Sequence, residues 1–112
     1  MKWDTLIEMD QLELIRQTSA EKSVLVFKHS TRCSTSRMVL DRLERNWKED
    51  EMKNVRFFFL DLIAHRDISN AIATNFEVPH ESPQVLIIKN GKSVYDFSHL
   101  EIDYHHIAKL IK

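Results

Sequence analysis

The one cysteine of this chain, Cys33, stands in a polar corner that could carry thiol chemistry. The corner runs from Ser30 to Ser36 (STRCSTS) and lies between an apolar run and a helical pattern. A helix N-terminus presents unpaired N–H groups and partial positive charge, which favour an anion such as a thiolate. Such a position, with cationic neighbours, lowers the pKa of a cysteine from ~8.5 to about 3.5–7.5. The corner therefore predicts that Cys33 is a nucleophile rather than a small buried apolar side chain.

Cationic and hydroxyl side chains surround Cys33 in the sequence and could stabilise its anion. Positive charge comes from Arg32 and Arg37, with Lys28 not far upstream. The hydroxyl groups could donate hydrogen bonds to the sulfur or cap the helix. They belong to Ser34, Thr35 and Ser36. His29, which ends the preceding apolar run, could assist proton movement, although the helix terminus could suffice without it.

The scarcity of two residue types excludes several kinds of site. A single cysteine excludes an internal disulfide and a zinc site built on several cysteines. A single glycine, Gly91, excludes glycine-rich phosphate loops, which need several glycines in one short stretch. The six histidines are scattered without the spacing of a helical zinc site, so we expect no bound metal.

Length and composition predict one globular domain over residues 1–112. Hydrophobic residues make up 43% and charged residues 29%, which are globular values. The formal net charge of -1 gives no reason to expect nucleic acid or an anionic membrane as a partner. No apolar run approaches the ~20 residues of a membrane span. The first residues carry acids where a signal peptide needs an apolar stretch, so we expect an intracellular, cytoplasmic protein.

Hydrophobic periodicity predicts an α/β fold whose elements would position the corner. Strand patterns cover Val24–His29, Val55–Ile63, Gln84–Lys89 and Lys92–Phe97. Helical patterns cover residues 9–18, the segment from the corner to about Trp47, Arg66–Phe76 and Ile102–Ile111. A helix joins the first two strands, so they should be parallel, while Asn90-Gly91 predicts a hairpin. The expected result is a mixed four-stranded sheet flanked by helices, with an extra N-terminal helix.

This order of elements, with a Cys-x-x-Ser corner and a proline just before the hairpin, resembles the thioredoxin fold. Cys33 matches the first position of the usual Cys-x-x-Cys motif, and Ser36 replaces the second cysteine. Pro83 matches the cis-proline of that superfamily. The resemblance implies that the Ser82–Pro83 bond is cis and that Pro83 packs beside Cys33.

Several blocks further resemble the monothiol bacilliredoxin family, over about residues 24 to 110. They are Phe27–Cys33 (FKHSTRC), His65–Asn70 (HRDISN), His80–Leu86 (HESPQVL) and Ser98-His99. Members of this family often carry a proline directly after the cysteine, where this chain has Ser34. Proline suits the first helical position without being required there, so the departure concerns the tuning of the thiol and not the fold.

The resemblance implies a monothiol redox function on protein mixed disulfides. The Cys33 thiolate would take a small thiol, bacillithiol, from S-thiolated client proteins and would then be freed by a second small thiol or a partner protein. Bacillithiol is thus implied as a co-substrate, with no bound cofactor. Arg32 would hold a carboxylate of the small thiol, Ser82 would offer backbone hydrogen bonds to the client, and Pro83 would shape the groove.

Two other functions stay open on the sequence. Monothiol glutaredoxins carry an iron–sulfur cluster between two subunits, but their corner is Cys-Gly-Phe-Ser, and this chain lacks the glycine after Cys33. A thioredoxin-like binding module would need no chemistry at Cys33 at all. The expected class remains an oxidoreductase with bacilliredoxin-like disulfide reductase activity.

Overall fold

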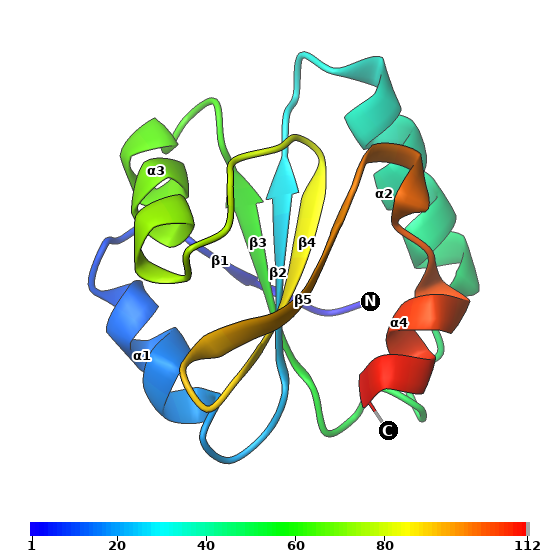
Figure 1. The fold of residues 1–112 in the computed structure, drawn as a ribbon. Coiled ribbons are helices and arrows are strands. Elements are labelled where there is room, and N and C mark those ends of the chain that lie inside the picture. Colours follow the sequence, from blue (N-terminus) through cyan, green and yellow to red (C-terminus); the bar gives the residue numbers. More distant parts are fainter. Residues whose placement is uncertain (112) are drawn as a thin grey trace.

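A five-stranded mixed sheet divides the molecule into two helical layers (Figure 1). The computed structural model describes residues 1–111, and the strand order is β1-β3-β2-β4-β5. The strands are β1 (Asp4–Thr5), β2 (Val24–His29), β3 (Arg56–Asp61), β4 (Gln84–Lys89) and β5 (Lys92–Ser98). The helices are α1 (Gln11–Thr18), α2 (Ser34–Asn46), α3 (Arg66–Asn75), the 3-10 turn η1 (His99–Glu101) and α4 (Tyr104–Ile111).

The central strand β2 is buried along its whole length, as its unbroken apolar run predicts. It pairs in parallel with β3, so that Lys28 lies beside Leu60. It pairs antiparallel with β4, so that Lys28 also lies beside Gln84. The parallel pairing through α2 and the antiparallel hairpin are both confirmed. The carboxyl ends of β2 and β3 and the start of β4 therefore meet at one end of the sheet.

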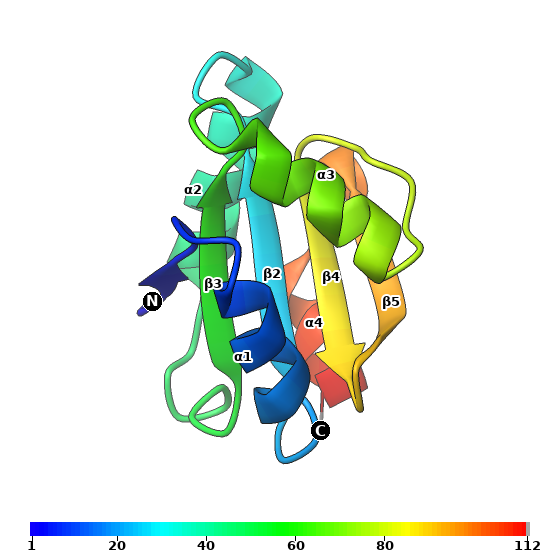
Figure 2. The same cartoon turned by 90° about the vertical axis from the view of Figure 1, so that its left-hand side faces the viewer.

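Each face of the sheet buries its own apolar cluster because side chains alternate along the strands. On one face, Val26 packs with Ile15 of α1 and Ile72 of α3. Figure 2 looks onto this layer, with α1 and α3 in front of the sheet. On the other face, Phe27 packs with Leu43 of α2, and α4 completes the cover.

The hairpin between β4 and β5 turns at Asn90-Gly91, as predicted. Both residues have positive φ, 52° for Asn90 and 76° for Gly91, which is the backbone of a tight hairpin turn. The Gly91 N–H donates to the hydroxyl of Ser19 at 2.8 Å, which attaches the hairpin to the end of α1.

The two-residue strand β1 adds a fifth, edge strand to the four predicted strands. Asp4 and Thr5 pair in parallel with Phe58 and Phe59 at the outer edge of β3. The Asp4 carboxylate accepts a hydrogen bond from the Arg56 guanidinium at 2.6 Å, which fastens this edge. A two-residue strand has too few positions to show a period of two, and only its partner makes it a strand.

None of the helices within residues 1–111 combines the length and apolar character that crossing a bilayer requires.

Candidate functional site

The sequence-predicted site residues gather at the end of the sheet where β2 and β3 finish. Cys33 directly precedes α2, and Pro83 directly precedes β4. Gln84 lies opposite Ser98, so the end of β5 and His99 reach the same end of the sheet. The topology thus brings the cysteine corner and the proline loop to one edge from positions fifty residues apart in sequence.

Cys33 is the N-cap residue of α2, at the strand-to-helix turn that the corner predicts. It is half-buried, with an extended backbone (φ -113°, ψ 116°). Its N–H donates to the Ser30 carbonyl at 3.2 Å, and its carbonyl accepts from the Arg37 N–H at 3.2 Å. The thiol forms no capping hydrogen bond with the first turn of the helix. The proposed stabilisation of a thiolate by the N–H groups of residues 34 to 36 therefore stays a prediction.

The hydroxyl of Ser36 does not face the sulfur as a hydrogen-bond donor. Ser36 is 0% exposed, and its Oγ lies 2.7 Å from Nδ1 of His29. The same Oγ accepts a hydrogen bond from the Ser30 N–H at 3.1 Å. The expectation that Ser36 donates to Cys33 is corrected here, because its hydrogen bonds are made with β2 and the residue that follows it.

The surroundings of His29 favour its neutral form. Burial lowers its pKa below the ordinary 6.5, the Asp61 carboxylate opposes this, and the Arg37 guanidinium adds to it. The ring lies 5.4 Å from that of Phe59 and 6.2 Å from that of Phe27, centroid to centroid. A neutral imidazole retains one nitrogen that accepts a hydrogen bond, which suits the Ser36 hydroxyl.

The other predicted residues of the corner lie at the surface. Arg32, Ser34 and Arg37 are exposed, and Thr35 is half-buried. The Arg32 N–H donates to the Ser30 hydroxyl at 3.3 Å. Among the residues that the structure describes, neither arginine side chain forms an ion pair with a carboxylate. Both guanidinium groups are therefore open to a ligand, and their roles at Cys33 stay predictions.

Lys28 belongs to a buried polar cluster that is not evident from the sequence. Its side chain is 0% exposed, and Nζ donates to the Ser69 carbonyl of α3 at 3.2 Å. It also lies 3.4 Å from Nδ1 of His80. Burial lowers the pKa of Lys28 to about 8. Adjacent residues of a strand point to opposite faces of the sheet. The sequence of β2 therefore already indicated that Lys28 and His29 lie on opposite faces, with His29 on the face that α2 covers.

The proline loop contributes a second hydrogen-bonded edge to the site. The Ser82–Pro83 peptide bond is cis, in agreement with the prediction. The Pro83 carbonyl accepts from the His99 N–H at 3.0 Å, and the His99 ring lies 3.3 Å from the Glu81 carboxylate. The Ser82 hydroxyl is buried without a hydrogen-bond partner. The hydrogen bonds predicted between Ser82 and a client involve the Ser82 backbone and not this hydroxyl, and they stay a prediction.

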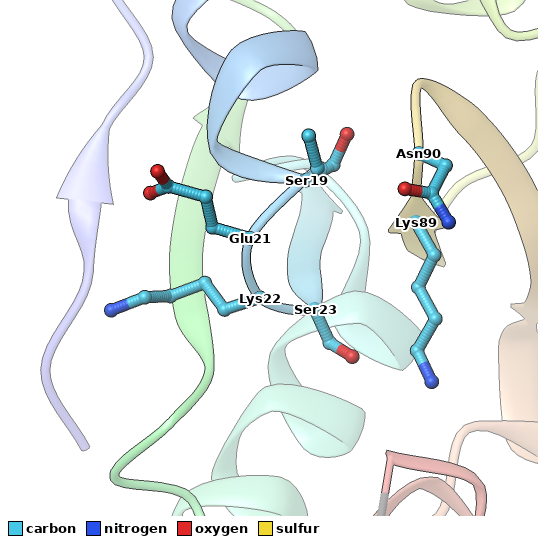
Figure 3. A pocket seen from close by; sticks show the side chains of 7 residues that line it. Ser19, Glu21, Lys22, Ser23, Lys89 and Asn90 are labelled. Atoms are coloured by element: carbon cyan, nitrogen blue, oxygen red, sulfur yellow. The ribbon is translucent and has the colours of Figure 1, made fainter.

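A cavity of about 250 Å³ lies at the far end of the sheet from Cys33 (Figure 3). Its walls come from the segment before β2 and from the end of β4, which is antiparallel to β2. The residues that line it are Ser19, Ala20, Glu21, Lys22, Ser23, Lys89 and Asn90. It is therefore separate from the cysteine corner. Within residues 1–111, no three His, Cys, Asp or Glu side chains are grouped as metal ligands would be.

We expect the free energy of unfolding to fall as the pH is lowered from 7.5 to about 5. The pKa of folded His29 lies below its ordinary 6.5. Between these two pKa values the unfolded chain binds a proton that the folded chain does not, so acid favours unfolding. Urea unfolding at both pH values measures the loss. A His29→Asn variant keeps an acceptor for Ser36 and cannot titrate, so its loss should be smaller; an equal loss would contradict the assignment.

Comparison with known proteins agrees with this geometry. The family described as "Monothiol bacilliredoxin BrxC" matches residues 4–107. A solved structure of a candidate oxidoreductase with a thioredoxin fold has a TM-score of 0.79 and 28% sequence identity, covering 97% of this chain and 93% of that chain.

Two thioredoxins show the same fold at lower identity. The Malassezia sympodialis thioredoxin (Mala s 13) has a TM-score of 0.76 and 17% identity, over 98% of this chain and 88% of that chain. The Fasciola hepatica thioredoxin has a TM-score of 0.71 and 22% identity, over 96% and 95%. The family and the first of these structures support a thiol-redox function. With its half-buried cysteine before α2 and the cis-proline loop at the same end of the sheet, the chain belongs to the monothiol bacilliredoxin family.

Proposed function

We propose that this protein removes a low-molecular-weight thiol, bacillithiol, from mixed disulfides on client proteins. The observation that carries the proposal is the placement of Cys33, the one thiol of the chain, half-buried at the start of α2. The cis-proline loop reaches the same end of the sheet. We propose the cytoplasm as its compartment, because small-thiol pools keep protein thiols reduced there.

The exchange needs only one sulfur of the protein. The Cys33 thiolate attacks the sulfur of the small thiol in the mixed disulfide, and a new disulfide forms between them as the old one breaks. The client leaves as a thiolate, which takes a proton from water. A second small thiol, or a thiol of a partner protein, then attacks the adduct and restores Cys33. Ser36 has no sulfur with which to displace the small thiol, so the adduct persists until that second thiol arrives.

The exposed groups of the corner would bind the two substrates. Arg32 would pair with a carboxylate of the small thiol, and Arg37 would add positive charge beside the sulfur. The first-turn N–H groups, with the side chains of Ser34 and Thr35, would stabilise the Cys33 thiolate. The backbone of Ser82 would hydrogen-bond an extended segment of the client.

The decisive experiment follows the mass of the small thiol from client to protein. Model clients carrying bacillithiol, glutathione or coenzyme A as mixed disulfides are mixed with the reduced protein, and intact masses are recorded over time. We expect Cys33 to gain the bacillithiol mass while the client thiol appears in step, with slower transfer from the other two. A Cys33→Ser variant should gain none, because an alcohol does not attack a disulfide.

Two results would overturn the proposal. Equal transfer of all three thiols would refute the choice of bacillithiol while leaving monothiol exchange in place. Absence of transfer, while Cys33 still reacts with an alkylating probe, would refute exchange itself. Iron–sulfur cluster carriage would then be examined by visible absorbance after anaerobic purification, and a binding role by the cellular activity of Cys33→Ala.

A further inference from the structure

A chain of hydrogen bonds runs from Cys33 into the core behind the corner. The Cys33 N–H donates to the Ser30 carbonyl at 3.2 Å, and the Ser30 N–H donates to the Ser36 hydroxyl oxygen at 3.1 Å. The Ser36 oxygen lies 2.7 Å from Nδ1 of His29. The last residue of β2 is thus tied to the first turn of α2, with the cysteine between them.

The hydrogen-bond network assigns the proton between Ser36 and His29. Within residues 1–111, Nδ1 of His29 is the one acceptor within reach of the Ser36 hydroxyl. The hydroxyl oxygen already accepts from Ser30, so we assign its own proton to the bond with Nδ1. The proton of the neutral imidazole is then on Nε2.

Burial makes this pair sensitive to the loss of either partner. Ser36 is 0% exposed and His29 is 7% exposed, so water does not readily replace a missing hydrogen bond. Ser36 is also three residues beyond Cys33, within one turn of the same helix, so a shift of its backbone moves the sulfur.

We propose that His29 is a positioning residue for exchange at Cys33: by accepting the Ser36 hydroxyl proton, it holds residues 30 to 36 in the conformation that presents the sulfur to a disulfide. The inference rests on the proposed function, in that the reaction is thiol–disulfide exchange at Cys33. Attack on a disulfide requires the incoming sulfur to be aligned with the bond that breaks, so a small displacement of the corner slows it.

Protonation of His29 in acid should break the hydrogen bond between Ser36 and His29. A protonated His29 has no lone pair on Nδ1, so it cannot accept the Ser36 hydroxyl proton. The charged groups that act on His29 are Asp61 from β3 and Arg37 and Asp41 from α2. Exchange by the wild-type protein should therefore fall in acid more steeply than the ionisation of Cys33 alone requires.

Four variants test the pair: Ser36→Ala, His29→Leu, the double variant and His29→Asn. The main measurement is the rate at which Cys33 exchanges with a small chromogenic aromatic disulfide at pH 7. We expect each of the first two to slow exchange about tenfold, the kinetic equivalent of one lost hydrogen bond. The double variant should be no slower than either single one, because the two side chains act as a unit.

The matched control is His29→Asn, whose side-chain oxygen can accept from Ser36. This variant should retain most of the wild-type exchange rate. Its exchange rate should not show the additional decrease in acid that we expect for the wild type. The rate of Cys33 alkylation by iodoacetamide at pH 7 should fall less than the exchange rate in all four variants, because alkylation does not require alignment with a disulfide. Circular dichroism confirms folding, and Ser36→Ala carries the test if His29→Leu does not fold.

Wild-type rates in both single variants, or losses that multiply in the double variant, would overturn the positioning role. Neither probe contains bacillithiol, so this outcome is independent of the substrate. A protein that shows the expected rate pattern but takes no bacillithiol from clients would retain the role of His29 and refute the proposed function.

Discussion

A Ser36→Cys variant is expected to convert this monothiol protein into a dithiol one. Cys33 is the N-cap residue of α2 and Ser36 lies in its first turn, so modest adjustment lets two thiols at these positions form a disulfide. After Cys33 takes up a small thiol, the new thiol would displace it and close an internal disulfide. We expect the adduct on Cys33 to decay at least ~100-fold faster than in the wild type, because the second step becomes intramolecular.

Intact-mass analysis distinguishes the two products of this variant. The wild-type protein should retain the mass of the small thiol, whereas Ser36→Cys should lose only the two thiol hydrogens. A Thr35→Cys variant is the matched control, because side chains two residues apart on a helix do not face each other. The Ser36→Cys change also removes the hydroxyl group that is hydrogen-bonded to His29. The comparison therefore uses the rate of adduct decay and not the rate of adduct formation. A long-lived adduct on Ser36→Cys would show that the two positions cannot meet.

Most helices and strands were predictable because the pattern of apolar residues in each segment matches the side of that segment that is buried in the fold. The buried strand β2 and the strand β4 have the predicted bounds, Val24–His29 and Gln84–Lys89, since apolar runs end there in polar residues. The strand β1 could not be predicted, because Asp4 and Thr5 carry no strand signal and pair only where β3 is already in place.

The site was predictable where it depends on chain order and not where it depends on side-chain direction. The strand–helix corner locates Cys33, and the resemblance to thioredoxins predicts the cis bond before Pro83, which lies at the same end of the sheet. The pairing of Ser36 with His29 requires knowing which way the first turn of α2 faces. The burial of Lys28 beneath α3 requires the packing of three separate segments, although the alternation of β2 already sets it apart from His29.

Replacing Lys28 with methionine is expected to stabilise the protein at neutral pH. Burial lowers the pKa of Lys28 from 10.5 to about 8, so holding the folded protein's ammonium away from water costs about 3 kcal/mol at pH 7. Methionine is unbranched, apolar and flexible enough to fill the same space. The change also removes the donor to the Ser69 carbonyl and to His80, and the loss of these hydrogen bonds reduces the expected stabilisation by roughly 1 kcal/mol. The Ser69 hydroxyl, 3.3 Å from His80, can replace one of these bonds.

The pH dependence identifies the cause of this stabilisation. Between about 8 and 10.5 the unfolded chain holds a proton on Lys28 that the folded chain has released. The free energy of unfolding of the wild type therefore gains from this group as the pH rises through that range. The advantage of Lys28→Met should be about 1–3 kcal/mol at pH 7 and should shrink towards pH 10.

Urea unfolding of both proteins at pH 7 and at pH 10 measures the difference. Lys92→Met is the matched control, since it removes an exposed lysine and should change the free energy of unfolding little at either pH. If Lys28→Met were less stable than the wild type at pH 7, the hydrogen bonds of the ammonium would outweigh its desolvation. Lys28 would then stabilise the fold, by joining α3 to the loop before Pro83, rather than weaken it.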